Sequence, residues 1–343
     1  MKDLRSLTIE ELQEEMKALW QPAFRAAQIF DWLHGKKVSG PDAMRNLPLS
    51  LREILRQSYD CSYLRTELRL ISKEDGTRKY VFELQDGNVI ESVLMKYDYG
   101  NTVCISSQVG CRMGCRFCAS TLDGLARNLL PGEMLEQIYR IEEDLGEKVS
   151  HIVVMGTGEP LDNLENLLRF LDLITHPKGK NLSERNITVS TCGLVPQIRK
   201  LAQEKRQITL ALSLHAARDE LRQSMMPVAH RYSVAETVAA CDEYFSLTGR
   251  RMSYEYSLVK GVNDGDSDAE DLSALLKGKN CHVNLIPVNP IRERDYQTPD
   301  REHAVRFQKI LEKNGINATI RRKMGADIES ACGQLRRRFK TQE

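Results

Sequence analysis

The chain has 343 residues, of which 41% are hydrophobic, which suits one large domain or a large domain joined to a smaller one. This hydrophobic content supports a sizeable core and excludes a globally disordered chain. The 49 lysines and arginines nearly balance the 48 aspartates and glutamates, giving a net charge of +1. Bulk charge therefore does not indicate a nucleic-acid partner, and any RNA must be bound by local basic patches.

The first residues are charged and have a helical pattern, and no run of the sequence approaches the roughly 18 apolar residues of a membrane span. We therefore expect a cytoplasmic protein without membrane contact. Nine cysteines in that compartment favour metal, cluster or thiol chemistry over a disulfide framework.

Residues 7–57 have helical periodicity, with a capped start at Thr8 and a capping box formed by Ser50 and Glu53. The period then changes to strand-like alternation over residues 68–96, with Asp-Gly turns at 75–76 and 86–87. We expect residues 1–98 to form an accessory region that is a candidate for RNA binding, consisting of a helical module and a small antiparallel sheet.

From about residue 100, strands and helices alternate, which indicates βα units around a parallel sheet. The expected strands are 102–106, 151–155, 187–191, 208–214, 252–258, 283–287 and 316–320. The expected helices are 132–145, 163–175, 195–205, 233–248, 268–276 and 300–314. The units are too few for a complete barrel, so we predict an α/β fold with a partial (βα)6-type barrel over residues 99–343. In such sheets the chemistry lies at the carboxyl ends of the strands.

Three cysteines directly follow the first barrel strand: Cys111, Cys115 and Cys118, in a glycine-containing loop. Thiolates are the ligands of iron–sulfur clusters, and three of them leave one iron open for a small molecule. The alternatives are a chance pattern or a structural zinc site. Zinc requires a fourth ligand, yet the loop contains no histidine and the next cysteine upstream is Cys104.

This Cys-x3-Cys-x-aromatic-Cys motif resembles that of the radical S-adenosylmethionine (SAM) enzymes. With the motifs at 106–111, 156–161, 213–215 and 331–335, the chain resembles the RNA adenine methyltransferases of the RlmN and Cfr group over nearly its whole length. The resemblance implies a [4Fe–4S] cluster on the three cysteines, whose open iron binds SAM. It also implies two SAM molecules per turnover and an electron donor such as flavodoxin or ferredoxin.

The stretch 156–160 follows an apolar strand, where glycines such as Gly158 allow a backbone to approach a ligand closely. Glu159 offers a carboxylate to a ligand ammonium group. The alternative is an ordinary turn between strand and helix. The resemblance favours SAM binding, because the stretch matches the SAM-binding segment of the family.

Small polar residues end three further strands, where a barrel presents ligands. Each of them taken singly also suits a turn or a helix cap. By resemblance, the residues that match the family's SAM contacts are Ser190, Ser213, Leu214, His215 and Asn289.

Cys332 lies in a polar, glycine-containing segment that suits a reactive thiol better than a core residue. The resemblance implies that one SAM methylates its sulfur and that a radical from a second SAM activates this methyl group for addition to adenine. By the same resemblance, Cys104 resolves the resulting protein–RNA adduct through a transient disulfide with Cys332, and Glu91 is a proton acceptor. The alternatives are a core cysteine at Cys104 and a solvent-facing side chain at Glu91.

The resemblance implies a monomeric enzyme that methylates C2 of adenine in large-subunit rRNA and in tRNA next to the anticodon. Two alternatives remain: a C8-adenine methyltransferase that confers antibiotic resistance, and a non-catalytic, metal-containing RNA-binding protein. Cys61, Cys192, Cys241 and Cys281 are interpreted as structural. Basic candidates for RNA contact are Lys36, Lys37, Arg45, Arg321, Arg322, Lys323 and Arg336 to Arg338.

Overall fold

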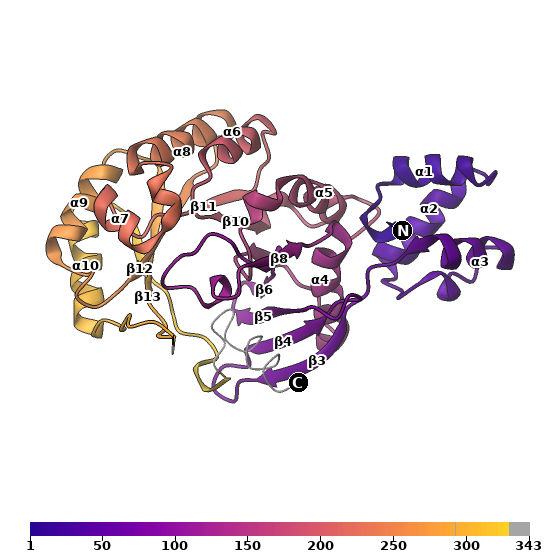
Figure 1. Ribbon diagram of the computed structural model, residues 1–343, viewed down its shortest axis with the longest axis horizontal. Coiled ribbons are helices and arrows are strands. Elements are labelled where there is room, and N and C mark those ends of the chain that lie inside the picture. The colour runs from indigo at the N-terminus through magenta and orange to yellow at the C-terminus, as the bar shows by residue number, and fades with distance from the viewer. Residues whose placement is uncertain (292, 329–343) are drawn as a thin grey trace.

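The computed structural model describes residues 1–291 and 293–328. Its centre is a ten-stranded sheet in the order β14-β13-β12-β11-β10-β9-β6-β5-β4-β3, with the helices following its outer face in an arc (Figure 1). All neighbouring pairs from β6 to β14 are parallel. The result is the predicted partial barrel, which does not close into a ring.

The seven predicted barrel strands are all present, with boundaries within a few residues of those expected. They are β6 (Gly100–Cys104), β9 (His151–Val154), β10 (Ile187–Thr191), β11 (Thr209–Ser213), β12 (Met252–Leu258), β13 (Cys281–Pro287) and β14 (Ala318–Ile320).

The six predicted helices are likewise confirmed. They are α4 (Pro131–Leu145), α5 (Leu164–Thr175), α6 (Val195–Gln203), α8 (Val234–Thr248), α9 (Asp266–Leu276) and α10 (Arg301–Lys313). The structure adds a short helix that the sequence pattern did not indicate, α7 (Asp219–Met225). None of the helices in the described ranges is long and apolar enough to cross a membrane.

The predicted antiparallel sheet is also present, but it extends the barrel sheet. It contains β3 (Arg65–Ile71), β4 (Arg78–Glu83) and β5 (Val89–Tyr97), and β5 pairs with β6. The two predicted Asp-Gly turns connect these strands, with Gly76 at φ +71° and Gly87 at φ +77°.

The two faces of each barrel strand differ in chemistry, as β12 illustrates. The ring of Tyr256 packs against Phe307 of the outer helix α10, with ring centroids 5.2 Å apart. Because side chains alternate along a strand, Ser253, Glu255 and Ser257 point to the other face, into the barrel. The barrel interior is therefore polar at positions where a closed barrel has branched apolar side chains.

The N-terminal module contains α1 (Ile9–Ala18), α2 (Phe24–Phe30) and α3 (Leu49–Ser58), and its short strand β1 (Lys2–Asp3) pairs with β2 (Tyr59–Asp60). It lies beside α4 and α5 (Figure 1). Arg5 joins module and barrel, because its buried guanidinium lies 3.2 Å from the Glu136 carboxylate on α4 and donates to the carbonyl oxygen of Ser62 at 2.9 Å.

The two predicted helix starts in this module have different outcomes. The Thr8 hydroxyl and the Glu11 carboxylate form the capping box of α1, which confirms the start at Thr8. The capping box at Ser50 is wrong, because α3 begins at Leu49 with Pro48 at the N-cap. The proline starts the helix earlier, so Ser50 lies inside the first turn.

Residues 321–328 lead from β14, at one edge of the sheet, to the β3–β4 turn at the other. The backbone N–H of Gly325 donates to Asp75 at 2.8 Å, and the N–H of Lys73 donates to Asp327 at 2.9 Å. Between the end of β14 and Gly325, the side chain of Met324 packs against the apolar cluster that contains Cys104. This segment therefore spans the open side of the partial barrel.

Candidate active site

The cysteine loop connects the two strands of an antiparallel ribbon, β7 (Gln108–Gly110) and β8 (Leu125–Asn128). The sequence pattern did not indicate this ribbon. Gly110 has φ +80°, and a Cβ at this position would lie 2.0 Å from the carbonyl oxygen of Gly124. Only glycine fits at this position. The close approach of the two strands also lets the backbone N–H of Cys111 donate to the same oxygen at 2.8 Å.

The loop brings the three predicted cluster ligands to one cavity of about 170 Å³, lined by Cys111, Cys115 and Cys118. Within the described ranges, no three His, Cys, Asp or Glu side chains are spaced to hold a single metal ion. The three cysteines line a common cavity without the spacing of a single-ion site.

The electrostatics of these thiols fit a cationic cluster. Burial raises the pKa of Cys111 to about 12 and raises that of Cys115 well above its usual value, and the neighbouring thiols add to both shifts. Three thiolates are therefore unfavourable together unless cations neutralise them. Iron–sulfur clusters supply such cations and take thiolate ligands, so the residues present fit the [4Fe–4S] group.

Residues 156–159, called the shelf below, follow β9 and pack against Ser107 and Gln108 at the start of the cysteine loop. Gly158 has φ +115°, and a Cβ there would lie 2.7 Å from the Ser107 hydroxyl oxygen. The N–H groups of Ser107 and Gln108 both donate to the Thr157 carbonyl oxygen, at 2.9 and 3.1 Å. The absence of a side chain at Gly158 therefore lets the shelf pack closely against Ser107 and Gln108. Gly158 also lines the 170 Å³ cavity.

Glu159 ends this shelf and is 3% exposed. Its carboxylate accepts hydrogen bonds from the backbone N–H of Leu161 at 3.1 Å and of Cys192 at 2.8 Å. Burial raises the pKa of Glu159, although these N–H donors oppose the shift. The side chains of Thr191 and Cys192 also hydrogen-bond to this carboxylate, so a ligand ammonium group would be bound here mainly through the buried negative charge.

A second cavity of about 220 Å³ adjoins the first, and it is lined by Ser190, Ser213, His215 and Asn289 among others. The hydroxyl oxygens of Ser190 and Ser213 lie 3.3 Å apart at the ends of β10 and β11. Leu214 differs from its neighbours, because its side chain is fully buried in the core and lines neither cavity.

His215 is held as a neutral imidazole. Its ring is buried beside Phe117, with centroids 4.5 Å apart, and its Nδ1 accepts from the backbone N–H of Ser257 at 2.8 Å. Burial, helped by the charge of Arg222, lowers the pKa of His215 to about 3. Since Nδ1 is an acceptor, the proton resides on Nε2, which makes His215 a hydrogen-bond donor.

Arg222 on α7 is a residue of the site that sequence reasoning missed. Its fully buried guanidinium donates to the carbonyl oxygens of Cys192 at 2.6 Å, Leu214 at 3.0 Å and Ser213 at 3.3 Å. It thereby joins the ends of β10 and β11 behind the two cavities. An isolated arginine in a short polar helix carries no sequence signal for this role.

Two of the predicted catalytic residues, Cys104 and Glu91, line neither of these cavities. Cys104 is buried on β6 in a cluster with Val93 and Met95, against which Met155 packs, and Met155 lines both cavities. Glu91 on β5 is 3% exposed and lies 3.1 Å from the ammonium of Lys79, so the solvent-facing alternative is wrong. Cys332 lies outside the described residues.

Comparisons with known proteins agree with this architecture. A family model described as "Radical SAM superfamily" matches residues 105–272, and one described as "Ribosomal RNA large subunit methyltransferase N-terminal domain" matches residues 2–60. A probable dual-specificity RNA methyltransferase RlmN of Lachnoclostridium phytofermentans is 57% identical over 98% of this chain and 95% of its own.

A Clostridium botulinum relative of the same name is 50% identical over 99% of each chain. A crystal structure of a radical SAM methyltransferase from Sphaerobacter thermophilus aligns with a TM-score of 0.93 and 44% identity. That alignment covers 97% of this chain and 99% of the other. Both the helical module and the partial barrel are therefore shared with these proteins.

Proposed function

The chain belongs to the RlmN family of radical SAM RNA methyltransferases, and on this premise we propose that it methylates C2 of adenine in large-subunit rRNA and in tRNA next to the anticodon. We further propose that it does so in the cytoplasm as a monomer, with flavodoxin or ferredoxin as electron donor. In this proposal residues 1–98 bind the RNA, and residues 99–343 contain the groups that catalyse the reaction.

When bound, the [4Fe–4S] cluster and SAM supply one-electron chemistry and a 5′-deoxyadenosyl radical. Cys111, Cys115 and Cys118 would hold the cluster, since all three line one cavity. Beside it, the Glu159 carboxylate would accept from the ammonium group of SAM. Ser190, Ser213, His215 and Asn289 line the adjoining cavity and would bind the rest of the molecule.

The aromatic C2 carbon of adenine is electrophilic, so it does not react with an electrophilic methyl donor. In our proposal a thiol of the protein therefore carries the methyl group before it reaches the base. The Cys332 sulfur would first accept a methyl group from one SAM by displacement, with S-adenosylhomocysteine as the leaving group. A hydrogen atom would then pass from this methyl group to the 5′-deoxyadenosyl radical, and the resulting carbon radical would add to C2. Cys332 becomes covalently joined to the RNA by this addition.

Release of the RNA requires a second thiol, for which we propose Cys104. The segment that leads to Cys332 supports this pairing, because Met324 packs in the same apolar cluster as Cys104. The adduct would first give up its C2 proton to a base and its unpaired electron to the bound cluster. Attack by the Cys104 thiolate on the Cys332 sulfur would then form a disulfide and break the bond from that sulfur to the methylene carbon, which takes up a proton and leaves as the methyl group of the base. Glu91 is the proposed proton acceptor, and it lies two residues from Val93, the register partner of Cys104.

One observation carries the proposal: the cluster cavity and the SAM cavity are adjacent and share their lining. Five side chains line both of them: Phe117, Cys118, Met155, Ser190 and Ser213. A ligand in the second cavity would therefore lie within reach of a cluster in the first, as the reductive cleavage of SAM requires.

Mass spectrometry of rRNA and tRNA from cells with and without the gene tests the proposal. We expect a C2-methyladenine that disappears on deletion and returns with the intact gene but not with Cys332→Ala. A methyl group at C8 would instead assign the protein to the alternative methyltransferase, and an unchanged methylation pattern in both RNAs would contradict the substrate.

A further inference from the structure

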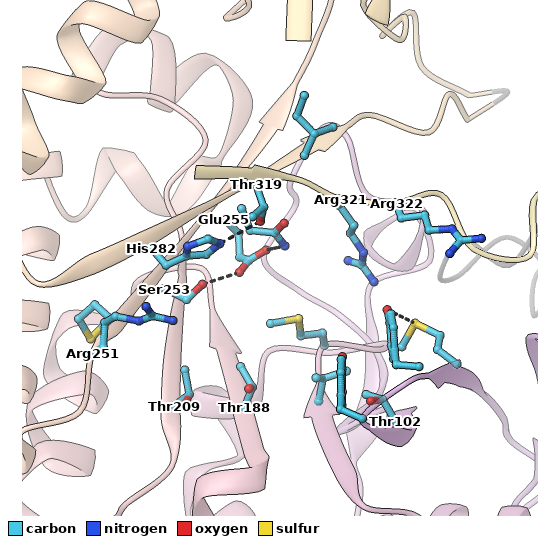
Figure 2. Close-up of a pocket in the computed structure, with 18 of the residues that line it drawn as sticks. Thr102, Thr188, Thr209, Arg251, Ser253, Glu255, His282, Thr319, Arg321 and Arg322 are labelled. Atoms are coloured by element: carbon cyan, nitrogen blue, oxygen red, sulfur yellow. Dashed lines mark hydrogen bonds between the residues drawn. The ribbon is translucent and has the colours of Figure 1, made fainter. Parts of the chain in front are cut away.

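The barrel interior continues past the SAM cavity into a larger one of about 680 Å³. This lower cavity occupies the amino-terminal half of the barrel, where Thr188, Thr209 and Ser253 stand near the starts of their strands (Figure 2). Met155, Glu255 and Arg321 line both the lower cavity and the SAM cavity. The two cavities are thus neighbours, and the lower one has the size of sites that hold drug-sized ligands, about 300–1,000 Å³.

The walls of the lower cavity are polar. Hydroxyl groups come from five strands, on Thr102, Thr188, Thr209, Ser253 and Thr319. The Thr102 side chain is 4% exposed, and its hydroxyl oxygen has no hydrogen-bond partner within the described part of the chain. Since buried hydroxyl groups normally find a partner, this lining is suited to a polar ligand.

The rim is electropositive. Arg251 lies on one side of the cavity, and Arg321 and Arg322 lie on the other (Figure 2). All three are exposed, and no salt bridge joins them to an acid in the ranges that the structure describes. Because the chain carries a net charge of only +1, this concentration of guanidinium groups is local and favours a phosphate-bearing ligand.

Among the described residues that line the cavity, Glu255 is the one with a carboxyl group. It accepts hydrogen bonds from the Asn284 amide at 2.7 Å and from the Ser253 hydroxyl at 3.0 Å (Figure 2). Burial raises the pKa of Glu255, which weakens the negative charge that this side chain would present to an anion. Together Glu255 and Asn284 offer the acceptors and the amide that pair with the edge of a base.

An aromatic surface completes the rim. The rings of Tyr97 and Tyr99 are stacked, with centroids 4.9 Å apart and an interplanar angle of 7°. Tyr99 is 63% exposed, and it occupies the turn between β5 and β6 beside the cavity. Proteins that bind single-stranded nucleic acid combine such exposed rings with arginines along the backbone path.

We propose that the lower cavity receives a nucleotide of the RNA substrate, unstacked from its strand, with phosphates at Arg251 and Arg322 and the base at Glu255 and Asn284. This inference rests on the proposed function and adds the route by which the RNA reaches the reacting groups. The base enters from the amino-terminal side of the barrel, and SAM binds on the other side of Met155 and Glu255. Tyr99 stacks on a base that flanks the target.

Steady-state kinetics with the reconstituted full-length enzyme test this route. The probe is large-subunit rRNA from cells that lack the gene. Arg251→Gln and Tyr99→Ala should each raise the KM for RNA about tenfold at little cost in kcat, because they remove a phosphate contact and a stacking surface. Thr319→Trp should fill the cavity and abolish RNA methylation, while iron content, SAM affinity and methylation of Cys332 stay at wild-type levels.

Arg199→Gln is the matched control. Arg199 is an exposed arginine on the outer helix α6, paired with Glu243, and its loss should leave the KM for RNA unchanged. Wild-type KM in Arg251→Gln, Tyr99→Ala and Thr319→Trp would overturn the route, and so would a loss of SAM affinity in Thr319→Trp. A wild-type enzyme that leaves the RNA unmethylated would instead contradict the proposed function itself.

Discussion

The carboxylate of Glu159 accepts a hydrogen bond from the backbone N–H of Cys192 at 2.8 Å, which joins the shelf after β9 to the end of β10. Both segments line the cavity that also contains the three cluster cysteines. A single side chain therefore holds two walls of the candidate site and supplies its buried negative charge.

We predict that Glu159→Gln weakens SAM binding at least tenfold, because an amide neither balances an ammonium group nor accepts two N–H groups equally well. The free energy of unfolding should fall by about 1–2 kcal/mol for the same reason. Equilibrium dialysis with SAM and thermal denaturation measure the two effects. Glu165→Gln, at an exposed position on α5, is the control, and equal SAM affinity in both variants would exclude Glu159 as the ammonium ligand.

Four cysteines line the cluster cavity, yet the proposed ligand set contains three. We predict that Cys115→Ala loses the iron of the reconstituted protein together with its visible iron–sulfur absorbance, whereas Cys192→Ala keeps both. Iron analysis and absorbance spectroscopy distinguish the two variants. Loss of iron from Cys192→Ala would make Cys192 a fourth ligand and leave no open iron for SAM.

The second thiol of the proposed mechanism can be tested by trapping. Cys104→Ala should accumulate a covalent protein–RNA species, because the adduct forms on Cys332 but cannot be released. A ribonuclease-sensitive shift in a denaturing gel detects this species. Cys241→Ala, which removes a buried thiol from α8, should give no shift, and normal turnover by Cys104→Ala would contradict the role of Cys104.

A pH effect on stability should arise where the N-terminal module meets the barrel. His34 is buried there, and its Nδ1 lies 3.1 Å from the Tyr139 hydroxyl. Burial, with the charges of Arg5 and His176, lowers its pKa well below 6.5. Since the unfolded chain binds a proton near pH 6.5 and the folded chain does not, the stabilisation is complete above that pH and is lost as the pH falls below it.

We therefore predict that His34→Asn makes the decline of unfolding free energy below pH 6.5 shallower by up to about 1.4 kcal/mol per pH unit. Denaturant titrations at a series of pH values measure this slope. His303→Asn on the surface of α10 serves as the control. An unchanged slope in His34→Asn would show that the acid sensitivity arises elsewhere.

Much of the fold could be predicted from the sequence, because buried parallel strands are short apolar runs separated by amphipathic helices. The exceptions have local causes. The helix α7 has seven residues and β7 has three, lengths at which periodicity carries little information. The burial of Glu91 depends on Lys79, which β-strand pairing brings next to it from an earlier position in the chain.

The candidate site was predictable where a motif marked it, as for Cys111, Cys115 and Cys118. The polar barrel interior was missed, although it has a sequence signal. Polar residues recur at every second position in Ser253, Glu255 and Ser257, within a strand whose other positions are aromatic or aliphatic. Such a pattern in a strand covered by helices indicates a chamber on the other face.

The hydrogen bonds that attach residues 325–327 to the β3–β4 turn join positions 250 and 254 residues apart. At the usual rate of about 5–20 residues per second, roughly 10–50 s pass between the synthesis of the β3–β4 turn and the synthesis of residues 325–327. Contacts of such long range also slow folding, because their loop-closure entropy is lost before they are formed. The open side of the barrel is therefore spanned only after residues 325–327 have been synthesised, and the hairpin of β3 and β4 must persist until then without these hydrogen bonds.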